Sequence, residues 1–146
     1  MTESDTTITT VRHDDPAFKQ VKAVRTAVFI REQNCRPEEE WDAEDAVATH
    51  LLAECGGEAA GTLRYYDDDG WLHSGRVAVL QAYRGRGLAR AMLRRCLDDG
   101  RNLGQTKSFL NAQVDKVGLY EREGFKPVGE EFMEAGIRHL RMEMAF

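Results

Sequence analysis

The sequence predicts a mixed α/β fold in which helices flank a sheet, and two observations lead to this class. Short segments rich in β-branched residues recur at strand length, separated by glycine-containing turns. Between them, two stretches place apolar residues at the three- and four-residue spacing of an amphipathic helix. No internal repeat, low-complexity tract or Pro/Gly-rich linker interrupts the sequence, so we expect one domain over residues 1–146. The expected order is β-α-α-β-β-β-α-β-α-β-β.

A strand and a helix are expected first. Thr7–Val11 is rich in β-branched residues and suits a strand. Asp15-Pro16 then suits a helix start, with Asp as the N-cap and Pro at the first helical position. One apolar helix face follows, formed by Phe18, Val21, Val24, Val28 and Phe29.

An acidic segment and a hairpin come next. Pro37 interrupts the helical pattern, and Glu38–Asp45 is open as a second short helix or a loop. The segments His50–Cys55 and Ala59–Tyr66 are expected strands. Gly56-Gly57 between them is typical of a hairpin turn.

The middle of the chain combines a long strand with the strongest helical pattern. Asp67–Gly70 suits a turn, and Trp71–Leu80 suits a strand that ends shortly before Arg84–Ala89. The apolar face of the following helix consists of Leu88, Met92, Leu93, Cys96 and Leu97. Gly104 is a natural stop for this helix.

The C-terminal part is expected to add three strands and a short helix. Phe109–Gln113 suits a strand. Asp115 can cap a short helix that runs through Tyr120 and is closed by Gly124. The last two expected strands are Phe125–Val128 and His139–Phe146.

Composition and charge argue against several classes of protein. The formal net charge of -5 disfavours a general nucleic-acid binder, and no apolar run approaches the roughly 20 residues that span a bilayer. The acidic, polar start Met1–Asp5 is unlike a signal peptide. Cys35, Cys55 and Cys96 form no CxxC motif and cannot all pair, which disfavours a disulfide scaffold or zinc site. We therefore expect a cytoplasmic protein that binds no nucleic acid, membrane or metal.

Opposite charges gather in two segments of the chain. Between residues 36 and 50, six acidic residues stand against one arginine. Between residues 76 and 101, seven arginines stand against two aspartates. The first segment can attract cations and the second can attract anions, although two solvated surfaces would give the same pattern.

The segment Arg84–Ala89 carries the most information about function. It follows an expected strand and opens a helix, whose N-terminus offers unpaired N–H groups and a partial positive charge. Its glycines allow the backbone to approach a ligand closely. These features predict a nest for a phosphate or pyrophosphate, with a plain glycine-rich turn as the alternative. A P-loop would need Lys-Ser or Lys-Thr after Gly87, and a dinucleotide fold would need a third glycine where Arg90 stands.

Two motifs resemble the GNAT superfamily of N-acetyltransferases. Arg84-x-x-Gly87-x-Ala89 matches their signature of Gln or Arg, then Gly, then Gly or Ala, and it follows the Arg-Val-Ala-Val strand Arg76–Val79. Leu119–Phe125 resembles their recurrent LYExxGF segment, and the expected order of elements is also theirs. Further segments resemble the small bacterial ElaA/YjcF-like group: Val28–Gln33, Glu40–Asp42, Asp45, His50–Ala53, Asn111–Gln113 and Gly136–His139.

The resemblance implies a mixed, mostly antiparallel sheet, splayed at its middle strands by a bulge, and the use of acetyl-CoA to acetylate a primary amine. The implied cofactor-binding residues are Val77, Ala78, Val79, Arg84, Gly85, Arg86, Gly87, Leu88, Ala89 and Asn111. The loop amides would hold the pyrophosphate, while Val77 and Val79 would pair with the pantetheine arm. A backbone N–H near Val79 would stabilise the oxyanion. Asn111 would position cofactor, substrate or water.

The same resemblance implies that Tyr120 is the general acid, since a phenol can protonate the leaving CoA thiolate. A packed aromatic is the alternative for this residue. His50 and His139 each begin an expected strand, and both are candidate bases or hydrogen-bonded structural residues. His13 and His73 show no such pattern.

Glu40, Asp42 and Asp45 are the candidate substrate-binding residues, because they could attract a cationic amine or accept its proton through water. A cysteine acyl-enzyme is the mechanistic rival. Cys96 lies on the apolar helix face, so we expect direct transfer in a ternary complex instead. A catalytically silent acyl-CoA sensor is the alternative function. The expected partner is a small-molecule or peptide amine, and homodimer formation is open.

Overall fold

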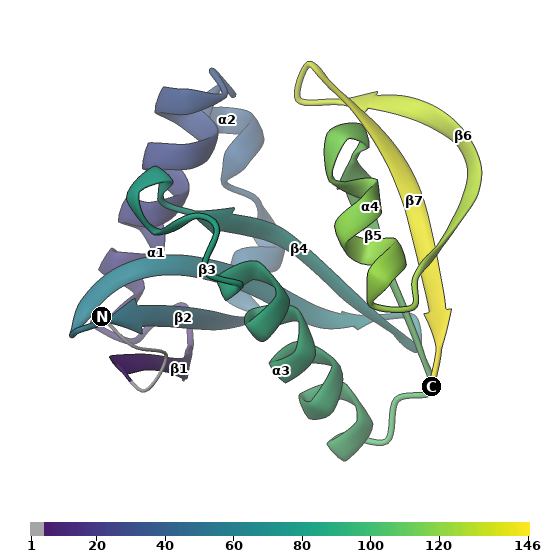
Figure 1. Cartoon of the computed structure of the whole chain (residues 1–146), viewed down its shortest axis with the longest axis horizontal. Helices are drawn as coiled ribbons and strands as arrows, with labels where there is room; N and C mark the ends of the chain where they lie inside the picture. Colours follow the sequence, from purple (N-terminus) through teal and green to yellow (C-terminus); the bar gives the residue numbers. More distant parts are fainter. Residues whose placement is uncertain (1–4) are drawn as a thin grey trace.

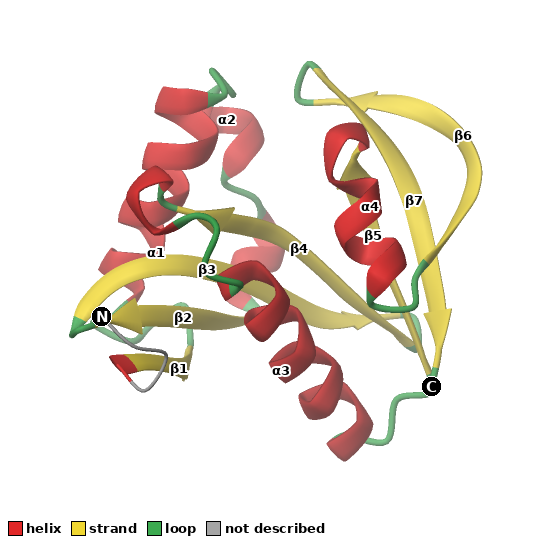
Figure 2. Cartoon of the chain, in the orientation of Figure 1, coloured by secondary structure: helices red, strands yellow, loops and turns green. Residues whose placement is uncertain are grey.

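One seven-stranded sheet runs through the protein, with helices on both of its faces (Figure 1, Figure 2). The computed structural model describes residues 5–146, so residues 1–4 of the acidic N-terminus lie outside the described residues. The strand order is β1-β2-β3-β4-β5-β7-β6, and β4 and β5 form a parallel pair among antiparallel neighbours. The expected mixed, mostly antiparallel sheet is confirmed.

The elements have the following bounds. The strands are β1 (Thr6–Val11), β2 (Thr49–Cys55), β3 (Glu58–Asp68), β4 (Trp71–Val79), β5 (Lys107–Gln113), β6 (Lys126–Glu134) and β7 (Ile137–Ala145). The α-helices are α1 (Phe18–Arg25), α2 (Pro37–Glu40), α3 (Leu88–Asn102) and α4 (Val117–Arg122). A π-helical segment, Thr26–Glu32, continues α1, and 3-10 turns cover Ala43–Ala46, Gln81–Tyr83 and Val114–Lys116.

The two helix starts expected from aspartates are wrong. The Asp15 side chain accepts a hydrogen bond from the Arg12 N–H at 2.8 Å, which closes a turn, and α1 begins at Phe18. Asp115 lies inside the 3-10 turn that precedes α4. At Asp15 the side chain is therefore used by a turn before the helix begins, because Asp competes well for nearby N–H groups.

Two hairpins extend further than the sequence indicated. β3 continues to Asp68, so the turn contains two residues, Asp69 and Gly70, both with positive φ. β6 and β7 meet across Ala135 and Gly136 in the same way. Two residues with positive φ match the twist of a tight hairpin. β6 is exposed along its whole length and carries a register shift, so it shows no hydrophobic alternation to read.

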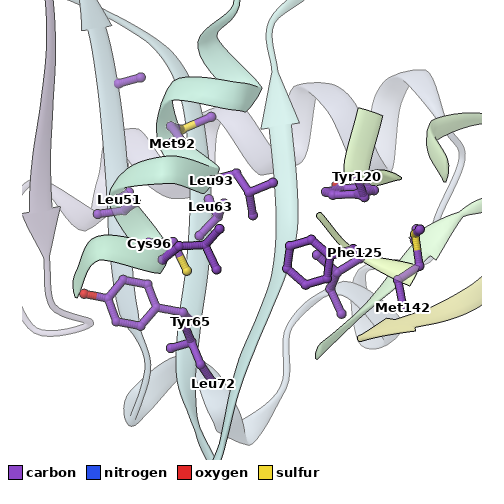
Figure 3. Close-up of a cluster of buried hydrophobic side chains, with 14 residues drawn as sticks. Leu51, Leu63, Tyr65, Leu72, Met92, Leu93, Cys96, Tyr120, Phe125 and Met142 are labelled. Carbon is purple, nitrogen blue, oxygen red and sulfur yellow. The ribbon is translucent and has the colours of Figure 1, made fainter. Parts of the chain in front are cut away.

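The sheet buries a different core on each face. Leu51 and Ala53 of β2 pack in a cluster with α3 residues, whereas Leu52 packs with Phe18 and Val21 of α1. This alternation follows from the two-residue period of a strand. Figure 3 shows the larger cluster, in which Met92, Leu93 and Cys96 of α3 face the sheet, with Tyr120, Phe125 and Met142 on the other side of the view.

β4 and β5 are hydrogen-bonded over a short stretch only, and the sheet opens between them beyond it. Their paired residues are Leu72 with Ser108 and His73 with Phe109. Further along, β4 carries a bulge at Arg76, whose φ is +50°, where its register to β3 shifts. In Figure 1 the two parts of the sheet meet near the C-terminus and diverge from there.

Two buried arginines hold the acidic segment against the body of the fold. Arg25, fully buried in α1, lies 2.6 Å from Glu40 and 2.7 Å from Asp45. Arg64 of β3 lies 2.5 Å from Asp42 and 2.8 Å from Asp45. The segment is a short helix followed by a 3-10 turn, and three of its carboxylates, those of Glu40, Asp42 and Asp45, are partners of internal cations.

We expect Arg25→Ala to lower the free energy of unfolding by about 3–5 kcal/mol, because each of two buried carboxylates, Glu40 and Asp45, loses its shortest ion pair. Urea denaturation measures this change. Arg36→Ala is the matched control, since Arg36 is 70% exposed in its pair with Glu39 and should change stability by less than about 1 kcal/mol. Equal effects of the two substitutions would contradict the structural role of Arg25.

Candidate active site

A cavity of about 700 Å³ opens where β4 and β5 diverge. Both strands line it, together with the segment before α3, the helix α4, the π-helical segment and the β6–β7 turn. Thirteen of the residues singled out from the sequence contribute to its lining: Glu40, Asp42, Val77, Ala78, Val79, Arg84, Gly85, Gly87, Leu88, Ala89, Asn111, Tyr120 and His139. The cavity thus gathers residues from segments that lie far apart in the sequence.

The loop before α3 has the backbone geometry of an anion-binding nest. Gly85 and Gly87 have φ values of +81° and +78°, and Gly87 precedes the first residue of α3. Glycine adopts these angles without the steric cost that a side chain brings. The first N–H groups of α3 lack acceptors within the helix, and they carry the partial positive charge of the helix dipole. An anion at this end of the cavity would find donors already in place.

The arginines of this region divide into different roles. The Arg84 guanidinium donates to the Val79 carbonyl at 2.9 Å and to both carboxylate oxygens of Glu32 at 2.7 and 2.8 Å. This bidentate pair joins the loop to the π-helical segment across the cavity. Arg90 lines the cavity, whereas Arg86 lies over the Tyr83 ring and Arg94 pairs with Glu123 at 2.7 Å. The helical spacing of Arg86, Arg90 and Arg94 therefore does not form one ligand-facing stripe.

Tyr120 lies on α4 with 7% of its surface exposed, and it lines the cavity. Burial raises the pKa of its hydroxyl to about 12, so the phenol stays protonated at neutral pH. Its ring meets Phe125 edge to face, at 6.3 Å between centroids. The hydrophobic packing orients the ring, and the hydroxyl is a proton donor at the cavity wall. Asn111, on β5, also lines the cavity.

The two histidines chosen as candidate bases differ in position. His50 is fully buried outside the cavity lining, with Nε2 3.0 Å from the Asp45 carbonyl and its ring against Phe18. Burial lowers the pKa of His50 below its ordinary value. His139 lines the cavity, donates from Nδ1 to the Ile137 carbonyl at 2.7 Å, and holds Nε2 3.6 Å from the Glu134 carboxylate.

Sequence reasoning missed His73, which lines the cavity at the last position where β4 pairs with β5. Its Nδ1 lies 3.1 Å from Asp68, and its ring stacks on Phe109 at 4.1 Å. Burial lowers the pKa of His73 below its ordinary value. The signal was the Asp69-Gly70 dipeptide, since a two-residue turn there brings Asp68 and His73 to neighbouring positions.

The acidic residues expected to attract a substrate are already neutralised within the fold. Asp45 is buried between Arg25 and Arg64 and does not contribute to the cavity lining. Glu40 and Asp42 line the cavity, but both also pair with Arg76, at 3.2 and 3.1 Å. Five further acidic residues contribute to the lining. Glu32 and Glu123 pair with Arg84 and Arg94, and the other three are Glu39, Glu44 and Glu134.

The cysteines lack the features of a nucleophile. Cys96 lies in the core under α3, and Cys55 is buried beside Leu88. Cys35 lines the cavity, but the pKa of its thiol is raised. Burial has the largest effect, and the negative charge of Glu40 raises the pKa further. A higher pKa leaves less of the reactive thiolate at neutral pH.

Two further features are absent from residues 5–146. Within this range, no group of three or more His, Cys, Asp and Glu side chains could hold a metal ion. No helix in the same range is long and apolar enough to cross a membrane.

Comparisons with known proteins agree with this geometry. The family model of the acetyltransferase (GNAT) domain matches residues 15–146. The chain is 30% identical over 133 residues to the uncharacterized N-acetyltransferase YjcF of Bacillus subtilis, covering 90% of this chain and 95% of that protein. The crystal structure of an acyl-CoA N-acyltransferase from Pseudomonas aeruginosa matches with a TM-score of 0.84 at 34% identity, covering 96% and 99% of the two chains. Escherichia coli ElaA matches with a TM-score of 0.81 at 27% identity, covering 95% and 99%.

We expect the protein to lose stability as the pH falls below about 6.5, because folding lowers the pKa of His50 from that value. Neutral His50 stabilises the folded state above pH 6.5, and acid favours the unfolded state in which it is protonated. The slope for one such group reaches about 1.4 kcal/mol per pH unit. Urea denaturation between pH 5 and 8 measures it. His50→Gln, which can still donate to the Asp45 carbonyl, should reduce the slope, and an unchanged slope in this variant would contradict the prediction.

Proposed function

The chain belongs to the GNAT family of acetyltransferases and to its ElaA/YjcF-like group, and from this we propose that it transfers the acetyl group of acetyl-CoA to a primary amine by direct attack in a ternary complex. One observation carries the proposal. A single cavity is lined both by the anion-binding loop before α3 and by the protonated hydroxyl of Tyr120. The first suits the phosphates of CoA, and the second suits the sulfur that leaves.

Acetyl-CoA would enter along the loop and β4. The N–H groups from Arg84 to Ala89 would bind the pyrophosphate, and the edge of β4 at Val77–Val79 would pair with the pantetheine arm. The divergence of β4 from β5 leaves backbone groups of this segment available at the cavity wall. A backbone N–H near Val79 would stabilise the oxyanion that forms when the amine attacks the thioester carbon.

Collapse of this intermediate breaks the carbon–sulfur bond. The thiolate would take the proton of the Tyr120 hydroxyl, which burial keeps in its protonated form. Tyr120 then regains a proton from the nitrogen, which must lose one to become an amide. The raised thiol pKa of Cys35 supports direct transfer over an acyl-enzyme.

The acceptor would approach from the acidic part of the cavity. Glu39, Glu44 and Glu134 line it there, and negative potential favours a cationic amine. The proposed acceptor is a small molecule or the amine of a peptide. We place the reaction in the cytoplasm. A homodimer is the one assembly that we propose for the protein.

Gly87→Glu is expected to abolish the stabilisation of the protein by acetyl-CoA, because a carboxylate in the nest repels the pyrophosphate. A ligand at 100 times its Kd stabilises the native state by about 2.7 kcal/mol, which is a clear rise in Tm. Gly104→Glu is the matched control, since Gly104 has a similar φ of +84° after the end of α3 and carries the same backbone strain. An unchanged ligand-induced Tm rise in Gly87→Glu would contradict the assignment of the nest.

Tyr120→Phe is expected to lower kcat by about 10²–10⁴-fold while leaving the Kd of acetyl-CoA unchanged, because it removes the proton donor and keeps the ring. Thiol release from acetyl-CoA with a panel of primary amines measures kcat. Tyr65→Phe is the matched control: Tyr65 is a buried tyrosine of the same core cluster, and its hydroxyl donates to Asp99. Tight binding of acetyl-CoA without release by any amine would favour a silent acyl-CoA sensor.

A further inference from the structure

Resting on the proposed function, we propose that His73, oriented by Asp68, is the general base that takes the proton of the acceptor ammonium. The acceptor must lose a proton before it attacks, because an ammonium nitrogen has no free electron pair. The cavity therefore needs a group that is unprotonated at neutral pH and reaches the space between the thioester and the acidic wall.

His73 stands where the two middle strands separate. In the sheet register, His73 lies opposite Phe109 of β5 on one side and Tyr66 of β3 on the other. All three strands belong to the sheet, and His73 also lines the cavity. Its ring lies between these two aromatic rings, at 4.1 Å from Phe109 and 4.8 Å from Tyr66. Its side chain keeps 19% of its surface exposed. The ring is thus held in one plane and still meets the cavity.

The partner of His73 fixes its tautomer. Asp68 Oδ2 lies 3.1 Å from Nδ1, and an ionised carboxylate can only accept, so Nδ1 carries the hydrogen. Nε2 then carries the electron pair and points away from Asp68. Within residues 5–146, Nε2 of His73 has no hydrogen-bond partner. Asp68 is 45% exposed, which connects the pair to solvent.

The charges around the ring act in both directions. Burial has the largest effect and lowers the pKa of His73, Asp68 raises it, Arg64 lowers it and Glu134 raises it. Arg141 lies on Phe109, with its guanidinium carbon 3.8 Å from the ring centroid. The net result is a pKa below the ordinary value, so the imidazole is neutral at pH 7 and can accept a proton.

His139 is less suited to this role, although it lines the same cavity. Its Nδ1 donates to the Ile137 carbonyl, and its Nε2 faces the Glu134 carboxylate at 3.6 Å. Both nitrogens are therefore directed at protein acceptors. His50 is buried outside the cavity lining.

The proton balance is complete with these residues. Nε2 of His73 takes one proton from the ammonium, directly or through one water. The nitrogen then forms the bond to the acetyl carbon, and the carbon–sulfur bond breaks as Tyr120 protonates sulfur. The second nitrogen proton restores Tyr120, and His73 releases its proton to solvent. The products are the acetylated amine, CoA thiol and one proton.

The test compares pH profiles of kcat for wild type and His73→Gln, with thiol release from acetyl-CoA as the readout. The acceptor is the best of spermidine, kanamycin, histamine and lysine methyl ester. We expect His73→Gln to lower kcat by about 10²–10⁴-fold at pH 7. The deficit should shrink about tenfold per pH unit as the pH approaches the pKa of the amine, because the free amine needs no base. His13→Gln, at an exposed position outside the cavity lining, should leave the profile unchanged.

A second variant and a spectroscopic measurement separate this role from a structural one. Asp68→Asn keeps the imidazole ring but removes the acceptor that fixes its tautomer, and it should lower kcat less than His73→Gln. Nitrogen-15 NMR of wild type should show a neutral His73 with hydrogen on Nδ1 at pH 7. Hydrogen on Nε2, or a deficit in His73→Gln that does not change with pH, overturns the proposal. If wild type is active and His73→Gln is equally active, the assignment of His73 as the base is refuted and the proposed function stands. If wild type turns over no amine, the proposed function is refuted as well.

Discussion

The short contact between β4 and β5 is the constraint on which the rest of the structure depends. The two strands are paired at two positions and then separate, since β4 bends at the bulge around Arg76. A sheet that stayed paired along both strands would have no cavity between them, because neighbouring strands lie less than about 5 Å apart. The divergence turns the middle of a sheet into a cleft with a strand on either side. The cavity, the exposed backbone of β4 and the position of His73 all follow from it.

The bulge is held in place by charge. Arg76 has a positive φ, which is unusual for a residue with a side chain, and its guanidinium lies between Glu40 and Asp42. Those carboxylates also face Arg25 and Arg64, so α1, the acidic segment and β3 are joined to the same point of β4. Buried ion pairs are a poor source of stability compared with apolar packing, yet their geometry is specific. Here they couple the shape of the cleft to the acidic segment that lines it.

Charge therefore has different meanings along this chain. From the sequence, the acidic segment from residue 36 to residue 50 could be expected to attract cations. In the structure its central carboxylates are partners of internal arginines. The basic window contains the predicted anion site, although the Arg84 side chain is paired with Glu32 and the nest is made of backbone. Net charge per segment could not distinguish these cases, because partners come from elements distant in sequence.

Much of the fold and the loop before α3 could be predicted from the sequence, because both depend on local patterns. Apolar spacing predicts α3, glycines mark the turns, and the glycines at 85 and 87 ahead of an amphipathic helix predict the nest. The start of α1 was predicted wrongly from Asp15, because the side chain of this residue closes a turn with Arg12 and does not cap the helix. The Asp69-Gly70 turn indicates that Asp68 lies near His73, but this local pattern does not give the role of the histidine. The roles of His50 and His73 depend on which strands lie beside them. Their chain neighbours are ordinary strand residues, and the three-dimensional packing alone buries His50 and places His73 at the point where the sheet opens.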